Sequence, residues 1–203
     1  MSKNNKQSAV EIVKELFKDY PISREMTPSQ FIDFYWNMYQ VNYSRDNSIN
    51  GAIFEQLLVI SLLRENISPV YTQAELAFVP NVILDIVLYN RKKPITISAK
   101  TSLRERWKQA DLEAMATKYV HREAKCYVVT LSEKEVQARR KEQNSYMGID
   151  QFVLAHTTEY DRLIEEIKQI AITESESIKI IQTDHKFHNI ETAQELYEIS
   201  LNK

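Results

Sequence analysis

The sequence has little of what several common functional sites require. Cys126 is the single cysteine among 203 residues, so an intrachain disulfide and a zinc site built from several thiolates are both excluded. Two glycines, Gly51 and Gly148, are too few for either common type of glycine-rich phosphate loop. These absences exclude a disulfide-stapled scaffold and the nucleotide-binding loops that depend on glycine.

Long apolar segments are also absent. The longest apolar run, LLVISLL from Leu57 to Leu63, is far shorter than the roughly 20 residues that a membrane-spanning helix needs. The first ten residues, MSKNNKQSAV, lack the apolar stretch of a secretory signal. We therefore expect a cytoplasmic protein.

The balance of charge is unremarkable for a globular domain. Hydrophobic residues make up 43% and charged residues 27% of the sequence, and the formal net charge is −2. Nucleic-acid binding needs only a local basic face, and residues 100–125 hold seven Lys or Arg against four acids. That surplus is modest, and charge alone favours a solvated helix face.

The pattern of apolar residues predicts helices first and a mixed sheet later. Strand segments are rich in β-branched and large apolar residues, and the polar turn NRKK joins two of them. Helices are predicted at about 8–19, 28–40, 51–65, 104–120, 132–143, 159–171 and the C-terminus, and strands at 74–79, 81–89, 94–100, 125–132, 149–155 and 178–183. The helix that starts after Gly51 is predicted to turn Ala52, Phe54, Leu57, Leu58 and Leu62 inward, and the helix at 104–120 to face the sheet with Trp107, Ala110, Ala114 and Met115. This order predicts a mixed α/β (α+β) protein with helices around a central mixed β-sheet.

Two charged residues end up close together in this scheme. Asp85 lies inside the apolar run VILDIVL, where a lone carboxylate is costly unless it is paired or binds a cation. Lys100 closes the next strand, ITISAK. A metal-dependent nuclease needs both types of group, because carboxylates hold Mg²⁺ against the scissile phosphate and a lysine positions the attacking water.

The spacing of these residues resembles the PD-(D/E)xK nuclease hairpin. Fourteen residues separate Asp85 from Lys100, which ends the triplet Ser98-Ala99-Lys100. Leu84 stands where the pattern has proline, and Ser98 stands where it has an acid.

The continuation of the sequence resembles one group of type II restriction endonucleases, the EcoRII/NgoMIV/SsoII-like group. In that group the missing acid comes from a glutamate on the next helix, and here Glu113 follows Lys100 by thirteen residues. The group also has an Arg-(Asp/Glu)-Arg element that contacts a CC/GG core, matched by Arg104-Glu105-Arg106. A further acid on the preceding helix is matched by Glu55. The resemblance covers about residues 50–125.

The resemblance implies a restriction-endonuclease-like fold and a Mg²⁺-dependent enzyme. It implies cleavage of both strands of double-stranded DNA at a short palindrome with a CC/GG core, leaving 5′-phosphates. Asp85, Glu113 and Glu55 would form the metal site, with Lys100 as the fourth catalytic residue. The partners expected are DNA, a second copy in a homodimer, and a DNA methyltransferase that is not a bound subunit.

The arrangement of domains is also an expectation. We expect one nuclease domain over residues 1–203, with 1–45 as a helical N-terminal elaboration and 50–155 as the catalytic core. The first fifty residues and the C-terminal third lie outside the resemblance.

The hydrogen-bonding groups of the bases support base recognition by the Arg-Glu-Arg triplet. Arginine can donate two hydrogen bonds to O6 and N7 of guanine, and glutamate can accept from N4 of cytosine. Arg104, Glu105 and Arg106 at the start of a helix could therefore address adjacent guanines and their paired cytosines.

Each of these residues also has a plainer interpretation. Asp85 and Lys100 could form a partly buried ion pair, and Glu113 could be a solvated helix carboxylate, with Asp111 as its competitor for the metal. Glu55 could neutralise a neighbour, and the Arg-Glu-Arg triplet could be a charge cluster at a helix start. Ser98 would then simply occupy the position of the missing acid.

Several other residues invite weaker hypotheses. Trp36 is a candidate for stacking on a flipped base, although an aromatic stripe on a helix usually packs in a core. Trp107 is expected to pack behind the recognition helix. His185 and His188 lack an evident third ligand, so a zinc site is not expected. We expect Arg139-Arg140 to be solvated.

Two other functions stay open from the sequence. A structure-specific DNA repair or recombination nuclease could use the same hairpin without a fixed sequence. A non-catalytic DNA-binding module could retain the fold with a decayed site.

Overall fold

The structure is a computed structural model that describes residues 8–43, 47–79, 81–142, 145–175, 181–183 and 189–201. Its helices and strands follow one another in the order that the sequence predicts. The helices are α1 Ala9–Asp19, α2 Pro28–Asn42, α3 Asn47–Arg64, α4 Arg106–Val120, α5 Glu133–Lys141, α6 Thr158–Lys168 and α7 Ile190–Tyr197. The strands are β1 Tyr71–Leu76, β2 Leu84–Leu88, β3 Ile95–Lys100, β4 Lys125–Thr130, β5 Gln151–Leu154 and β6 Ile181–Thr183.

The sheet is mixed, which confirms the predicted fold class. Its six strands lie in the order β5-β4-β3-β2-β1-β6. β2 pairs antiparallel with β1 and β3, and β6 pairs antiparallel with β1. β4 pairs parallel with β3 and β5, so helices must cross over between these strands.

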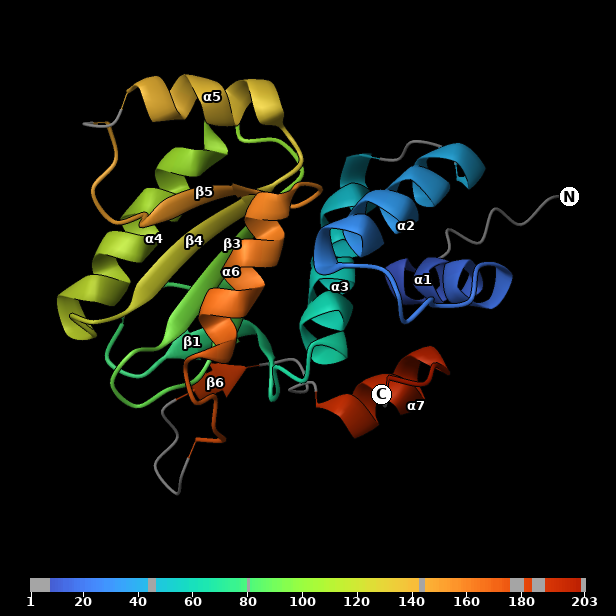
Figure 1. The fold of residues 1–203 in the computed structure, drawn as a ribbon. Helices are drawn as coiled ribbons and strands as arrows, with labels where there is room; N and C mark the ends of the chain where they lie inside the picture. The colour runs from blue at the N-terminus through green and yellow to red at the C-terminus, as the bar shows by residue number, and fades with distance from the viewer. Residues whose placement is uncertain are drawn as a thin grey trace, which may run out of the picture.

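Helices cover both faces of the sheet (Figure 1). On one face, α3 and α6 pack against the sheet, and α1, α2 and α7 join the same hydrophobic core. On the other face, α4 covers two smaller clusters, one over β4 and β5 and one over β1 and β2. α4 therefore crosses the sheet, which brings its middle over the β2–β3 hairpin. Within the described residues, no helix is long and apolar enough to cross a membrane.

α3 begins earlier than predicted. The sequence placed its start after Gly51 with Ala52 facing inward, but the helix begins at Asn47 and Ala52 is exposed. α3 lies between the sheet and the N-terminal helices, so it is buried on nearly every side from Ile53 to Leu63. A helix that is apolar all round has no single buried face, and its periodicity then gives a poor guide to orientation.

α4 uses a narrower face than predicted. Trp107, Ala110 and Ala114 are buried as expected, but Met115 is 39% exposed. Successive residues of a helix point about 100° apart, so Ala114 and Met115 cannot both face the sheet. The turn at Gly148 packs so closely on α4 that a Cβ there would overlap the helix backbone.

Strand boundaries differ by a few residues. β1 begins at Tyr71, three residues before the predicted start, and ends before Phe78, whose φ of 65° turns the chain away. Asn90 forms the predicted NRKK turn, because its side chain accepts hydrogen bonds from the amides of Lys92 and Lys93. Residues 178–180 of the predicted last strand, and His185 and His188, lie outside the described residues. The predicted division of the chain at residues 45 and 155 stays a prediction.

Candidate active site

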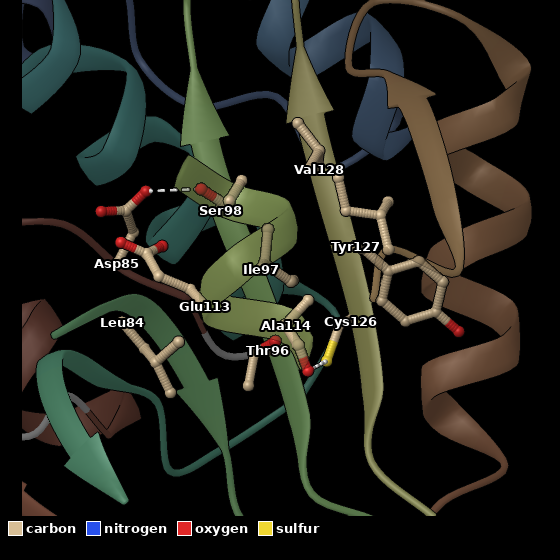
Figure 2. Close-up of a pocket in the computed structure, with 12 residues that line it drawn as sticks. Leu84, Asp85, Thr96, Ile97, Ser98, Glu113, Ala114, Cys126, Tyr127 and Val128 are labelled. Carbon is tan, nitrogen blue, oxygen red and sulfur yellow. Dashed lines mark hydrogen bonds between the residues drawn. The ribbon is translucent and has the colours of Figure 1, made fainter. Parts of the chain in front are cut away.

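Asp85 lies at the start of β2, where its carboxylate is held from the neighbouring strand. Oδ2 accepts hydrogen bonds from the Lys100 Nζ at 2.6 Å, from the Ala99 amide at 2.9 Å and from the Ser98 Oγ at 3.2 Å. Both side chains of the ion pair are largely buried, at 20% and 16% exposed. Ser98 thus does more than occupy the position of a missing acid, since it orients Asp85 (Figure 2).

Glu113 reaches the same place from α4. Ser98 and Lys100 are two residues apart in a strand, so they share the sheet face that α4 covers. Figure 2 shows the Glu113 carboxylate beside that of Asp85, and both residues line one pocket between α4 and the sheet. Oε1 of Glu113 accepts a hydrogen bond from Gln109 Nε2 at 2.7 Å. Burial raises the pKa of Glu113, the charge of Asp85 adds to this, and Gln109 and Lys100 oppose it.

Glu55 approaches the cluster from α3. Burial raises the pKa of Glu55 to about 7, and the charge of Asp85 adds to the rise. The hydrogen bond from Gln73 Nε2 to Glu55 Oε2, at 2.8 Å, and the charge of Lys100 act in the opposite direction. The charges of Asp85 and Lys100 therefore act on both Glu55 and Glu113, so the structure places these two glutamates within the electrostatic influence of the Asp85–Lys100 ion pair without gathering all three acids into one cage.

Gln73 was not predicted from any sequence pattern. This residue has a φ of 47° inside β1, a left-handed conformation that residues other than glycine seldom adopt. Its strand neighbours pair with β2 as Thr72↔Ile86 and Ala74↔Leu84, which places Gln73 opposite Asp85. Strained backbone often clusters at functional sites, and here the strain accompanies the hydrogen bond to Glu55.

The residues present fit a magnesium ion. Among the described residues, no three His, Cys, Asp or Glu side chains are already gathered closely enough to hold a metal. Mg²⁺ does not require such a cage, since it is usually bound by one or two carboxylates together with waters and substrate phosphates. Asp85 and Glu113 supply two carboxylates whose mutual repulsion a cation would relieve.

The Arg-Glu-Arg triplet lies just beyond this cluster, where β3 leads into α4. Arg104, Glu105 and Arg106 are all exposed. Glu105 is the N-cap residue of α4 and pairs with Lys108, and Arg106 is the first residue of the helix. The triplet therefore sits at a helix start as predicted, with its side chains available to a partner.

Asp111 is separated from the site, which removes it as a competitor of Glu113. Its buried carboxylate accepts hydrogen bonds from the amides of Met147, Gly148 and Ile149, at 2.7 to 3.1 Å. Asp111 holds the turn before β5 against α4. Two residues apart on a helix, Asp111 and Glu113 face different directions.

Other predicted residues have structural roles. Trp36 packs against Tyr39 and Phe54 at the edge of the main core. Trp107 is a buried packing residue, 7% exposed, in the cluster between α4 and the sheet. The expectation that Arg139-Arg140 is solvated was wrong, because Arg139 stacks on Trp107 and Arg140 pairs with Glu159. Trp107 and Glu159 are far from these arginines in the sequence, so no local sequence pattern predicts the two contacts.

Comparisons with known proteins support the fold. No protein-family model and no curated protein sequence matches the chain. The structure is similar to a solved structure described as a restriction endonuclease PspGI–substrate DNA complex, with a TM-score of 0.57 and 19% sequence identity, over 82% of this chain and 83% of that one. The chain therefore has a restriction-endonuclease-like fold. A fold of this kind does not determine function, which depends on the residues of the site.

Proposed function

We propose that this protein is a Mg²⁺-dependent type II restriction endonuclease. It would hydrolyse both strands of double-stranded DNA at a short palindrome with a CC/GG core, such as CCGG or CCNGG, and leave 5′-phosphates. The observation that carries the proposal is the meeting of Asp85 from β2 and Glu113 from α4 beside Lys100, within a restriction-endonuclease-like fold.

The cluster has the groups that phosphodiester hydrolysis needs. Asp85 and Glu113 would hold Mg²⁺, and Glu55, on whose pKa the charge of Asp85 acts, is the third candidate ligand. When bound, the ion would stabilise the negative charge that develops on the phosphate in the transition state. Ser98 and the Ala99 amide keep the Asp85 carboxylate in place for this role.

Lys100 would act on the attacking water. Its ammonium group lies 2.6 Å from Asp85 and can hold a water against the phosphorus while offsetting charge on the phosphate. The water oxygen forms a bond to phosphorus, the bond from phosphorus to O3′ breaks, and O3′ takes up a proton. The products are a 3′-hydroxyl and a 5′-phosphate.

Recognition would fall to the exposed triplet. Arg104 and Arg106 can each donate two hydrogen bonds to a guanine edge, and Glu105 can accept from a cytosine amino group. The triplet follows Lys100 by only a few residues, so the contacted bases would lie close to the cut phosphate. This proximity suits cleavage within or beside the recognised core.

Cutting both strands of a palindrome requires two active sites related by a two-fold axis. A homodimer supplies them most simply, because each copy then meets the same half-site. A DNA methyltransferase that protects the host site would be a functional partner but not a subunit. Such an enzyme would act in the cytoplasm as part of a restriction–modification system.

A mapped digest tests this proposal. Plasmid DNA containing every short palindrome would be incubated with the protein in Mg²⁺ or in EDTA, and fragment ends would be sequenced. We expect cuts at one CC/GG-containing site, in Mg²⁺ only, and none with a folded Lys100→Ala control. No Mg²⁺-dependent cut at any defined site would overturn the proposal. Cleavage of branched DNA at no fixed sequence would indicate a structure-specific nuclease instead.

A further inference from the structure

The backbone that carries the Arg-Glu-Arg triplet is held from a distant helix. Oε2 of Glu135 accepts a hydrogen bond from the Leu103 amide at 2.8 Å, and Oε1 accepts one from the Arg104 amide at 3.0 Å. Glu135 lies in the first turn of α5, beyond β4, and 31 residues after Arg104. One carboxylate thus fixes two successive peptide groups at the start of the recognition segment.

The segment needs such a support. Arg104 has a φ of 38°, a left-handed conformation that is costly for a residue with a side chain and that persists only where the surroundings impose it. Leu103 is buried beneath it, and the Leu103 carbonyl accepts the amide of Arg106 at 2.7 Å. The direction of the Arg104 side chain follows from this backbone, so the contact with Glu135 determines where the arginine points.

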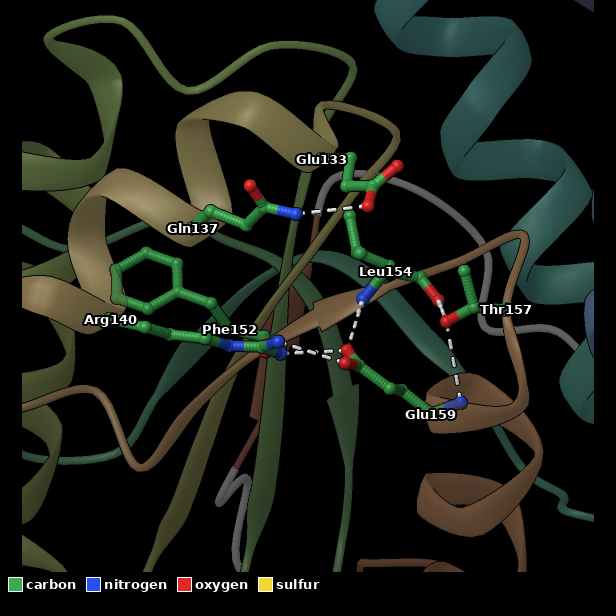
Figure 3. Close-up of polar contacts among 7 residues, drawn as sticks. All are labelled: Glu133, Gln137, Arg140, Phe152, Leu154, Thr157 and Glu159. Atoms are coloured by element: carbon green, nitrogen blue, oxygen red, sulfur yellow. Dashed lines mark hydrogen bonds and ion pairs between the residues drawn. The ribbon is translucent and has the colours of Figure 1, made fainter.

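α5 itself is firmly anchored. Val136 is fully buried, and the Arg139 guanidinium lies 4.9 Å from the ring centre of Trp107, in the first turn of α4. At the other end of α5, Arg140 makes two contacts to the Glu159 carboxylate, at 2.8 and 2.7 Å, and one to the Phe152 carbonyl at 2.8 Å (Figure 3). The helix can therefore serve as a rigid support.

Glu135 has the right charge state to act as an acceptor. Burial raises the pKa of Glu135, but hydrogen bonds from Ser132 and from the Leu103 and Arg104 amides outweigh this effect, and the net pKa is lowered. An ionised carboxylate accepts both amides at once and makes stronger hydrogen bonds than a neutral group.

We propose that Glu135 is a positioning residue for sequence discrimination. It contacts no base, and it acts by holding the backbone from which Arg104 meets the DNA. This inference rests on the proposed function and adds a residue of α5 to base recognition. Its consequence is that discrimination between sites, more than cleavage as such, depends on Glu135.

Two matched variants test this role. Glu135→Gln keeps the size of the side chain but replaces one acceptor oxygen with an NH₂ group that faces an amide donor. Glu133→Gln removes the same charge from the same first turn of α5, where the exposed Glu133 carboxylate accepts a hydrogen bond from Gln137 Nε2 at 3.0 Å. Each variant therefore removes one negative charge from the N-terminal end of α5.

The first readout is discrimination. The kcat/KM for the mapped site is divided by that for duplexes with one core base pair changed. We expect Glu135→Gln to reduce this ratio about tenfold, within the range that one arginine–guanine contact provides, and Glu133→Gln to leave it unchanged. In the double variant with Arg104→Ala, we expect no loss beyond that of Arg104→Ala alone, because both changes remove the same contact. Additive losses, or equal behaviour of the two glutamine variants, would overturn the proposal.

The second readout does not depend on cleavage. Amide hydrogen exchange at Leu103 and Arg104 should become at least about tenfold faster in Glu135→Gln and stay unchanged in Glu133→Gln, since exchange requires the protecting hydrogen bond to open. Unchanged exchange in Glu135→Gln would show that the carboxylate does not hold this backbone. If the wild-type protein cut no defined site, the proposed function and the role in discrimination would fall together, and exchange would still decide whether Glu135 supports the loop.

Discussion

The catalytic cluster and the Arg-Glu-Arg triplet adjoin each other but are supported in different ways. Asp85, Lys100 and Glu113 lie on regular elements and are shielded from solvent to a large degree. Asp85 and Lys100 form an ion pair, and the charges of both act on the pKa of Glu113. The triplet consists of exposed side chains on a strained backbone that α5 holds from outside. If the proposed function holds, damage to the cluster should abolish cleavage, whereas damage to the triplet should change which DNA sequence is cleaved.

The largest effect is expected at the centre of the cluster. Lys100→Ala removes the group that pairs with Asp85 and would orient the attacking water. We expect kcat to fall at least about a thousandfold, because general acid–base and electrostatic contributions of this kind are each worth two to four powers of ten. Single-turnover cleavage measures this, with Lys92→Ala in the exposed NRKK turn as the control. Retention of activity within tenfold would assign the water to another group.

A second pair of variants separates the two acids of α4. Glu113→Gln should reduce cleavage about a hundredfold and leave thermal stability intact, because burial already opposes its charge. Asp111→Asn should instead lower the free energy of unfolding by about 1–3 kcal/mol, since three amides, two of them buried, lose part of their acceptor. Urea unfolding and cleavage at a temperature where both proteins are folded distinguish the roles. The reverse pattern would place the metal site at Asp111.

The triplet should show a smaller effect of another kind. Arg104→Ala should cost about 1–3 kcal/mol of discrimination at the core base pairs, with a much weaker effect on nonspecific DNA binding. Competitive cleavage of the mapped site and its single-pair variants measures this cost. Arg91→Ala, in an exposed turn, is the matched loss of one positive charge. An identical result for both variants would assign Arg104 to general phosphate attraction.

The smallest effect concerns pH and Glu55, whose pKa is about 7. Its ionised fraction rises about tenfold between pH 6 and pH 8, so cleavage that uses this carboxylate should rise with pH through neutrality. The Glu55→Gln variant should lose that part of the pH dependence. A pH–rate profile that is unchanged in the variant would remove Glu55 from the metal site.

The raised pKa of Glu55 also makes the stability of the fold depend on pH. Because the folded pKa of Glu55 lies above its unfolded value, the folded state binds more protons than the unfolded state between about 4.5 and 7. Its contribution to stability is therefore complete at low pH and is lost as pH rises through about 7. Mg²⁺ should raise the melting temperature more at pH 8 than at pH 6, because the cation binds the ionised acids.

The sequence was most informative where the fold is locally regular. Alternation in ITISAK placed Ser98 and Lys100 on one face, and helical spacing in α4 placed Trp107, Ala110 and Ala114 against the sheet. Asp85 and Lys100 could be named from the residues themselves, as a carboxylate inside an apolar run and a lysine at the end of the next strand, whereas Glu113 and Glu55 were named through the resemblance to a group of nucleases.

Contacts across long separations in sequence could not be predicted. Gln73 donates one hydrogen bond to Glu55, 18 positions away, and Glu135 accepts two from amides 31 and 32 positions away. Neither residue lies in a sequence pattern that marks such a role. The left-handed backbone conformation at Arg104 could not be predicted, because the residue that adopts it is not a glycine. These features depend on how packed elements meet, which local propensity does not determine.

One binding measurement tests most directly whether DNA cleavage and sequence recognition depend on separate groups of residues. Lys100→Ala protein is titrated against a duplex carrying the mapped site and against duplexes with one core base pair changed. We predict that it cleaves none of them and still prefers the mapped site by at least about tenfold, the discrimination expected of a single bidentate base contact. A Lys100→Ala protein that binds all the duplexes equally would contradict the account, because recognition would then depend on the catalytic cluster itself.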